Sequence, residues 1–402
     1  MSREMRHSGI EWIGEIPKEW KTCYTSSLFH EHKEKNIGLK NTNLLSLSYG
    51  KIKQKDINTN EGLLPQSFET YNVIRKGDIV FRLTDLQNDK RSLRTGLCKE
   101  DGIITSAYVT LRANAEVDSA YFHFLFHSYD ECKVFYGLGD GVRQGMNWAD
   151  VRKLSVLVPP LSEQQKIANY LDKVCGEVDE MIALQEQMIE ELKAYKQSVI
   201  TEAVTKGLNP DVPMKESGID WIGEVPEHWE VAKLKYYIKV DSGDAITNEQ
   251  LEVTGLYPVY GGGEIMGYYS SFNTDDEALI VGRVGARCGC VTLTEGKSWA
   301  TDNALIVKTD WLLKYVFYLL QGANLNRLNT SNAQPLITAT KIKNVYVPIL
   351  ESDEQQSIAS YLDTKCAEID ALIDIKQAKI DELKDYKKSV IYEYVTGKKE
   401  VV

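Results

Sequence analysis

Two long stretches of the chain carry apolar residues at alternating steps of four and three, the spacing of a coiled-coil helix. The first runs over 163–205 and recurs without a gap over 354–396. At 1.5 Å per residue, each stretch predicts a helix about 60 Å long. The seam of the first comprises Ile167, Leu171, Val174, Val178, Met181, Gln185, Met188, Leu192, Tyr195 and Val199, and that of the second Ile358, Leu362, Ile369, Leu372, Leu383, Tyr386 and Val390.

Polar residues mark the register and the start of these helices. The second seam contains three lysines, Lys365, Lys376 and Lys379. Polar seam residues weaken a coiled coil but fix its register and its partner. At the helix starts, Ser162 with Gln165 and Ser352 with Gln355 have the S-x-x-Q spacing of a capping box. Because the two helices match in length and sequence, we expect them to pack together rather than lie apart in a larger bundle.

A second repeat precedes each helix at a distance. The phrase SGIEWIGEIPKEW over 8–20 returns as SGIDWIGEVPEHW over 217–229. Between phrase and helix lie two regions without mutual similarity that share one pattern of elements. In the first we expect strands over 73–85, 102–113 and 151–160 and a helix over 120–136. In the second we expect strands over 277–294, 300–309 and 342–350 and a helix over 310–322.

These repeats predict the fold class and the domains. We expect an α+β protein in which two α/β domains are joined by two long antiparallel coiled-coil helices, with an internal pseudo-two-fold repeat. The predicted boundaries are 1–160 and 209–350 for the two domains, each with its tryptophan phrase, and 161–208 and 351–402 for the helices. A chain of 402 residues is also too long for one ordinary core.

Composition narrows the class of protein. The sequence contains no apolar run of the roughly 20 residues that span a bilayer, and its N-terminus lacks the apolar core of a signal peptide. We therefore expect a cytoplasmic protein without a membrane partner. The seven cysteines are scattered and lack the spacing of structural zinc sites, so we expect reduced thiols and no bound metal.

Catalytic motifs are missing from the sequence. The glycines over 261–267 do not match the dinucleotide fingerprint, and the GKS at 296–298 lacks the first glycine of a phosphate loop. Motifs of methyltransferases, hydrolases and metalloproteases are also missing. We expect a chain that is not an enzyme and binds no cofactor of its own.

The distribution of charged residues along the chain indicates nucleic-acid binding, although the total charge does not. The net charge of the chain is −11, but residues 21–157 hold 19 Lys and Arg against 16 Asp and Glu. Lys51, Lys53 and Lys55 alternate along one predicted strand and would share a face. A polar loop and the segment after the helix add further cations, namely Arg82, Lys90, Arg91, Arg94 and Arg143. These residues are candidate DNA contacts, and ordinary solvated charge is the alternative.

The second variable region is less basic but rich in glycine and tyrosine. Its glycines at 261–263 would let backbone approach a ligand closely. The candidate DNA contacts here are Tyr260, Gly262, Arg283 and Arg287. Tight turns in a β-rich core would explain the same glycines.

Three features recur in both halves of the chain: the doubled tryptophan phrase, the VP dipeptide of the strand that precedes each EQQ-x-IA-x-YLD helix start, and the ELKxYKxSVI sequence near each helix end. On these features, the chain resembles the specificity subunit of Type I restriction–modification enzymes. The resemblance covers the whole chain. It implies two target recognition domains, each reading half of a bipartite, asymmetric site in double-stranded DNA, and two helices that act as a spacer. It also implies docking of two modification subunits, which carry adenine methyltransferase chemistry and S-adenosylmethionine, and of restriction subunits that use ATP and Mg.

This resemblance explains why segments are repeated. Two identical modification subunits need equivalent docking surfaces, so repeated segments would face them and the variable regions would face DNA. Trp12, Trp20, Trp221 and Trp229 would pack each domain onto its helix or contact the partner, and packing is favoured. The seam residues expected to organise assembly are Ile167, Leu171, Val178, Leu192, Ile358, Leu362, Ile369 and Leu383. A tandem-domain coiled-coil scaffold that binds no DNA is the competing function.

Overall fold

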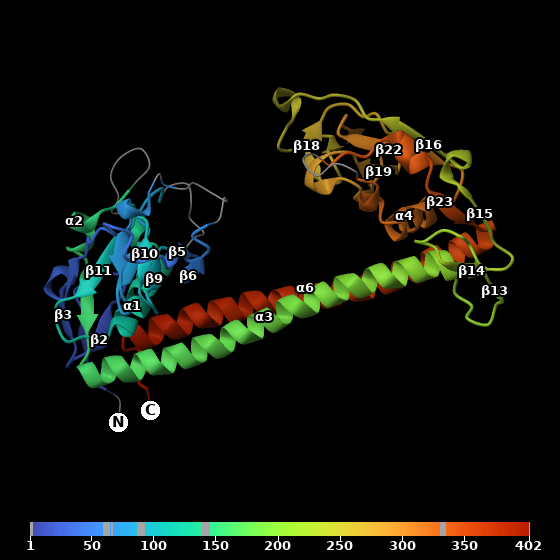
Figure 1. Cartoon of the computed structure of the whole chain (residues 1–402). Coiled ribbons are helices and arrows are strands. Elements are labelled where there is room, and N and C mark those ends of the chain that lie inside the picture. The colour runs from blue at the N-terminus through green and yellow to red at the C-terminus, as the bar shows by residue number, and fades with distance from the viewer. Residues whose placement is uncertain are drawn as a thin grey trace. The chain divides into compact units, whose positions relative to one another are not determined.

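The fold consists of two compact units of similar construction (Figure 1). The computed structural model describes residues 3–58, 65, 67–86, 93–137, 145–329 and 335–401. Unit 1 comprises residues 1–184 and 379–402, and unit 2 comprises residues 185–378. Each unit therefore contains one α/β domain together with part of both long helices.

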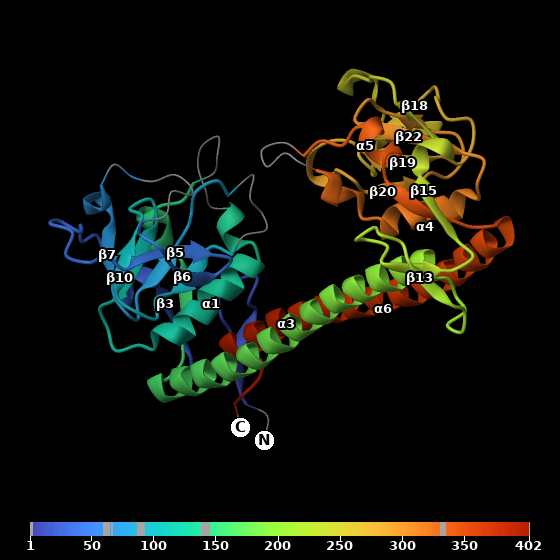
Figure 2. The same cartoon turned by 45° about the vertical axis from the view of Figure 1, so that its right-hand side comes forward.

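The two long helices are α3 (Leu161–Lys206) and α6 (Ser352–Val395). In both units a segment of α3 packs antiparallel on a segment of α6 (Figure 2). Lys387 bonds Asp179 at 2.6 Å in unit 1, and Lys196 bonds Asp370 at 2.6 Å in unit 2. The two lysines are 191 residues apart, as are the two aspartates, so both units use the same helix register. The predicted fold class is confirmed.

The domain of unit 1 is built on two four-stranded sheets. The first has the order β6 (Lys51–Lys55), β5 (Leu44–Ser48), β10 (Gly102–Ile104) and β7 (Asn72–Ile74). The second has the order β4 (Phe29–Glu31), β11 (Val109–Ala113), β8 (Ile79–Phe81) and β9 (Thr95–Leu97). The unit also contains two separate strand pairs, β1 (Met5–His7) with β2 (Glu15–Pro17) and β3 (Lys21–Tyr24) with β12 (Ser155–Val158). The helices are α1 (Ser119–Glu131) and the short α2 (Trp148–Val151).

Unit 2 repeats this plan. Its four-stranded sheet has the order β16 (Ile238–Ser242), β22 (Ala304–Thr309), β19 (Leu279–Gly282) and β20 (Val291–Leu293). Its three-stranded sheet has the order β18 (Ile265–Tyr269), β17 (Tyr257–Tyr260) and β21 (Trp299–Ala300). The strand pairs are β13 (Met214–Glu216) with β14 (Glu224–Pro226) and β15 (Glu230–Lys233) with β23 (Tyr346–Ile349). The helices are α4 (Leu313–Gly322) and α5 (Ala339–Lys343).

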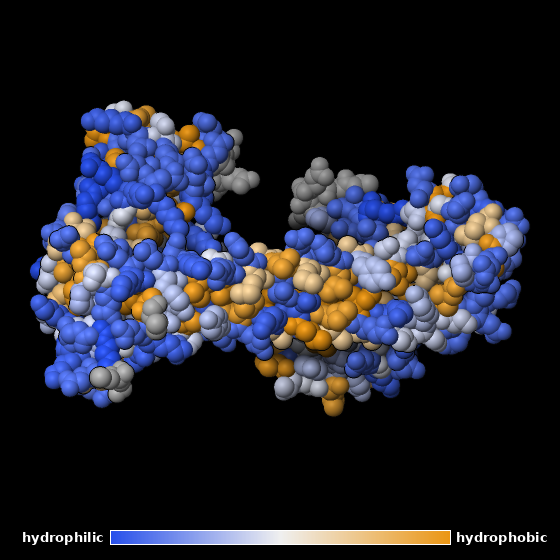
Figure 3. Space-filling model, turned by 90° about the horizontal axis from the view of Figure 1, so that it is seen from below, coloured by the Kyte–Doolittle hydropathy of each residue, from blue (hydrophilic) through white to orange (hydrophobic). Residues whose placement is uncertain are grey.

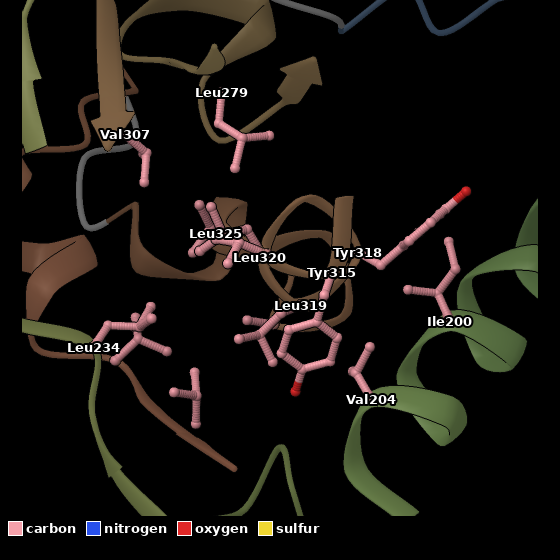
Figure 4. Packing of buried hydrophobic residues seen from close by; sticks show 14 of the residues in the cluster. Ile200, Val204, Leu234, Leu279, Val307, Tyr315, Tyr318, Leu319, Leu320 and Leu325 are labelled. Atoms are coloured by element: carbon pink, nitrogen blue, oxygen red, sulfur yellow. The ribbon is translucent and has the colours of Figure 1, made fainter. Parts of the chain in front are cut away.

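Each domain shares its hydrophobic core with the long helices. In unit 2, Tyr315 and Leu319 of α4 face Ile200 and Val204 of α3 (Figure 4). A Cβ on Gly322 would approach Val204 to 2.7 Å, so this glycine lets the two helices pack closely. In unit 1 the corresponding core packs α1 against both long helices. The domains are therefore anchored on the helices by buried apolar surface, which is the dominant stabilising contribution.

The tryptophan phrases join the start of one long helix to the end of the other. Trp20 is buried, and its indole N–H donates to Glu163 at 3.0 Å at the start of α3. Its ring also lies against Gly397 after α6, where a Cβ would approach it to 3.1 Å. Trp229 repeats this arrangement with Glu354 at 3.0 Å. It lies likewise against Gly207 after α3.

A buried glutamine ties each long helix to the domain helix. Gln164 accepts from the backbone N–H of Asp118, the N-cap of α1, at 2.9 Å. Gln355 accepts from that of Leu312, the N-cap of α4, at 3.3 Å. The capping-box expectation is corrected here. In the first predicted box, Ser162 lies inside α3, which begins at Leu161. In the second, the side chain of Gln355 donates to the carbonyl of Leu350 and accepts from the N-cap of α4.

The seam of α3 departs from the predicted heptad at two positions. Met181 is 45% and Tyr195 is 59% exposed, so neither lies in the seam. Their neighbours toward the C-terminus, Ile182 and Lys196, are half-buried instead. Of the eight seam residues expected to organise assembly, seven are buried and Leu192 is half-buried.

Candidate nucleic-acid interface

The three lysines of β6 are exposed on the edge strand of the first sheet. Lys51 donates to one oxygen of Asp179 on α3 at 2.8 Å, and Lys387 of α6 donates to the other at 2.6 Å. Lys51 thus ties the β5–β6 hairpin to the helices. Lys53 and Lys55 form no ion pair with any residue in the described part of the chain, and their ammonium groups are available to an outside anion.

The Asp179 carboxyl that accepts from both lysines has a lowered pKa. Burial raises the pKa of this carboxyl, but hydrogen bonds from Lys387 and Lys51 outweigh that effect and hold it below its ordinary value. The equivalent Asp370 of unit 2 is bonded by Lys196 of α3. Unit 1 therefore connects a hairpin of its α/β domain to an ion pair whose counterpart in unit 2 lies within the helix pair.

Arg94 lies in the interior of unit 1, with 0% of its surface exposed. Its guanidinium donates to the carbonyls of Thr84 at 2.9 Å and Asp85 at 3.3 Å, and lies 5.9 Å from the ring of Tyr136. The structure corrects the expectation that Arg94 offers its guanidinium to DNA. It holds the base of the loop between β8 and β9, and sequence charge alone could not reveal that role.

A buried carboxyl supports the same loop base. Asp130 of α1 accepts a hydrogen bond from the backbone N–H of Arg94. Burial raises the pKa of Asp130 to about 6 although this bond lowers it. Because the pKa in the folded chain lies above the ordinary value near 4, the stability that this group contributes falls as the pH rises from about 4 through about 6.

The remaining candidate cations of the first domain lie in the segment between β8 and β9, at Arg82, Lys90 and Arg91, or after α1, at Arg143. Arg82 is half-buried, and its backbone N–H donates to the carbonyl of Arg94 at 2.8 Å, which extends the pairing of β8 with β9. Lys90, Arg91 and Arg143 lie outside the described residues, and their role in DNA contact stays a prediction.

Arg287 is an exposed candidate DNA contact of the second domain. It ends a short 3-10 turn between β19 and β20, and it pairs with Glu264 in the turn between β17 and β18. Gly262 packs against it, because a Cβ at this glycine would approach the Cβ of Arg287 to 3.1 Å. Arg283 is half-buried at the start of the same loop. Glu264 was not among the predicted site residues, because a carboxylate by itself is repelled by the DNA backbone.

Tyr260 belongs to the core rather than the surface. Only 6% of it is exposed, and it packs with Ala278, Ile280 and Ala300 between the two sheets of unit 2. The expectation that Tyr260 contacts DNA is corrected accordingly. Its place at the end of β17 positions the glycine turn that follows.

The long helices expose one apolar patch in each unit, called here the helix patches. The patch of unit 1 comprises Met181, Leu184 and Tyr386, and that of unit 2 comprises Leu372, Ile375 and Tyr195. The ion pairs Lys387–Asp179 and Lys196–Asp370 bring Tyr386 and Tyr195 to the same level along the helix pair as Met181 and Leu372. Figure 3 shows apolar residues along the exposed face of these helices. The same three positions are thus apolar in both units.

Neither a cluster of metal-ligand side chains nor a membrane-spanning helix is found among the described residues. Among those residues, no group of three or more His, Cys, Asp or Glu side chains could hold a metal ion. No helix among them has the length and apolar character needed to cross a membrane.

The chain is similar to named relatives over part or most of its length. It is 33% identical over 121 residues to the Type I restriction enzyme EcoprrI specificity subunit of Escherichia coli, a match that covers 29% of each chain. It is 24% identical over 291 residues to the Type I restriction enzyme MjaVIII specificity subunit of Methanocaldococcus jannaschii, covering 65% of this chain and 67% of that protein.

The fold and the family agree with these relatives. A chain from a solved structure concerning assembly and conformational transition of the type I R-M system superposes with a TM-score of 0.68 at 16% identity. The superposition covers 95% of this chain and 99% of that one, which shows a common fold. A family described as the Type I restriction modification DNA specificity domain matches residues 17–194 and 226–385, one segment in each half of the repeat. The chain therefore belongs to the family of Type I restriction–modification DNA specificity proteins, whose members are the non-catalytic subunits that select the DNA sequence.

Proposed function

We propose that each unit reads one half of a bipartite, asymmetric site in double-stranded DNA. The recognition domains are residues 1–160 and 209–350, and the spacer helices are residues 161–208 and 351–402. The observation that carries this proposal is the repeat of sheet order and helix joints in the two units, whereas the loops that carry cations differ. Equivalent scaffolds with different loops suit two readers of different sequences.

The proposed DNA contacts combine positioning and reading roles. Lys53, Lys55 and Arg82 would contact phosphates or bases in the first domain, and Gly262, Arg283 and Arg287 in the second. Lysine contacts to phosphate supply affinity that depends on salt, whereas arginine contacts to guanine supply specificity. The competing scaffold function leaves the exposed Arg287 loop without a purpose and does not fit the family.

The modification subunits would dock on the helix patches, one copy in each unit. Equal patches at equivalent positions are what two identical partners require. Those subunits would supply S-adenosylmethionine and adenine methylation, and restriction subunits would add ATP- and Mg-dependent cleavage. This chain would contribute no reacting group.

The test of the function is the methylated sequence. In cells that express this chain with its modification subunit, single-molecule sequencing should find adenine methylation in one split motif, with two specific parts separated by unspecified bases. Cells with the modification subunit alone should lack the motif. Methylation that is independent of this chain, or confined to an unsplit motif, would contradict the proposal.

Docking is tested by charge at the patches. Leu184→Glu and Ile375→Glu alter residues that are 54% and 62% exposed, so the fold should tolerate both. Each would bury an unpaired carboxylate against the partner. We expect each single variant to weaken one docking site by about tenfold or more, and native mass spectrometry should show one bound modification subunit in place of two.

The control for docking is Ala367→Glu, which adds the same charge at an exposed position of α6 outside the patches. This variant should retain two modification subunits. The double variant Leu184→Glu with Ile375→Glu should retain none. If the double variant binds two copies with the affinity of the wild type, the helix patches are not the docking surface.

A further inference from the structure

Arg287 and Glu264 form an exposed ion pair on two neighbouring turns of unit 2. Arg287 comes from the turn between β19 and β20, and Glu264 from the turn between β17 and β18. Their side chains are 50% and 66% exposed. An exposed ion pair contributes little stability, because water screens both charges. Its stability contribution therefore does not account for the structure built around it.

Glycines hold the backbone of Arg287 against the neighbouring turn. A Cβ on Gly282 would collide with the carbonyl oxygens of Arg287 and Gly262, and a Cβ on Gly262 would approach Arg287 to 3.1 Å. The backbone N–H of Cys290 also donates to the Arg287 carbonyl at 3.0 Å. Arg287 is consequently fixed where larger residues at 262 and 282 would displace it.

The turn that carries Glu264 is fixed as well. The N–H of Gly261 donates to the Glu264 carbonyl at 3.2 Å. The hydroxyl of Thr292 on β20 donates to the carbonyl of Gly263 at 3.0 Å, which ties this turn to the sheet of Arg287. Two side chains on hydrogen-bonded turns lose little freedom when they bind, which favours specific recognition.

The charge of this pair fits a base edge better than a phosphate. Arg287 with Glu264 carries no net charge, and the carboxylate would be repelled by the DNA backbone. A guanidinium beside a carboxylate offers donors next to an acceptor. In the major groove, a G·C pair presents the complementary set, the guanine N7 and O6 acceptors beside the cytosine N4 donor.

We propose that Arg287 and Glu264 together read one G·C base pair in the half-site of unit 2. Arg287 donates to guanine and Glu264 accepts from the cytosine amino group. This inference rests on the proposed function, and it adds Glu264 as a specificity-determining residue and a G·C pair as its target.

The test compares Glu264→Gln and Glu264→Ala with the wild type by sequencing the methylated motif. We expect both variants to relax the same single position, with discrimination reduced about tenfold or more, and that position should be G·C in the wild-type motif. Arg287→Ala should relax that position too. Asp241→Asn is the matched control, because Asp241 pairs with Lys308 at 3.4 Å in the same unit at similar exposure. It should keep the wild-type motif.

Three results would overturn the inference. One is an unchanged motif in both Glu264 variants whose melting temperatures equal that of the wild type. A second is relaxation at a position that is A·T in the wild type. If Glu264→Ala only tightens binding to every DNA, the carboxylate merely repels phosphates and the inference is wrong. Absence of any split motif in the wild type would instead contradict the proposed function itself.

Discussion

Replacement of residues 230–347 by the corresponding region of a relative is expected to change one half of the methylated motif and leave the other as it was. The exchanged region contains β15 through the first half of β23 and the Arg287 turn, whereas both helix patches and the domain of unit 1 lie outside it. Assembly should therefore persist while one reader changes. Motif sequencing of the chimera provides the measurement.

The reciprocal chimera, with residues 21–158 exchanged, provides the control. It should alter the other half of the motif and keep the half that contains the position read by Arg287. If either exchange altered both halves, or neither, the two units could not be independent readers and the modular proposal would fail.

Leu171→Asp is expected to unfold unit 1. Leu171 has 0% of its surface exposed and lies in the core that joins the domain to the long helices. Loss of its packing alone should cost about 2–5 kcal/mol, and a buried unpaired carboxylate adds to that cost. Thermal denaturation should show a large fall in melting temperature, and limited proteolysis should cut first within residues 21–158.

The repeat supplies matched comparisons for this substitution. Leu362 is the equivalent residue of unit 2 and is also 0% exposed, so Leu362→Asp should expose residues 230–347 first. Leu184→Asp places the same charge at a 54% exposed position and should leave the melting temperature nearly unchanged. Equal melting temperatures for Leu171→Asp and Leu184→Asp would show that the buried seam does not hold the unit together.

The repeat and the helices could be predicted from sequence, but two positions of the α3 seam could not. Along α3, apolar residues stand side by side at Val174 with Cys175 and at Met181 with Ile182, so spacing alone does not decide between the neighbours. Further along α3, apolar character favours Tyr195 over Lys196 as the seam residue. Lys196 is half-buried because Asp370 on α6 pairs with it, a contact between residues distant in sequence.

The candidate site shows the same limit. Charge identifies the exposed Lys53, Lys55 and Arg287 as candidates, but it also groups Arg94 with them although its guanidinium is used inside the protein. Whether an arginine is buried depends on carbonyls and a carboxyl brought to it by the fold. Glu264 was missed for the opposite reason, because an acidic residue counts against DNA binding until its partner Arg287 is known.

The strand pairs β3 with β12 and β15 with β23 have a consequence for how new specificities arise. The strand that leads into each domain is hydrogen-bonded to the strand that leads out, over four residues in each case. Both ends of a domain therefore lie side by side, and the residues between them can change in number without displacing the start of α3 or α6. Recombination within the two short gene segments that encode such a pair would deliver a complete new reader to an unchanged assembly.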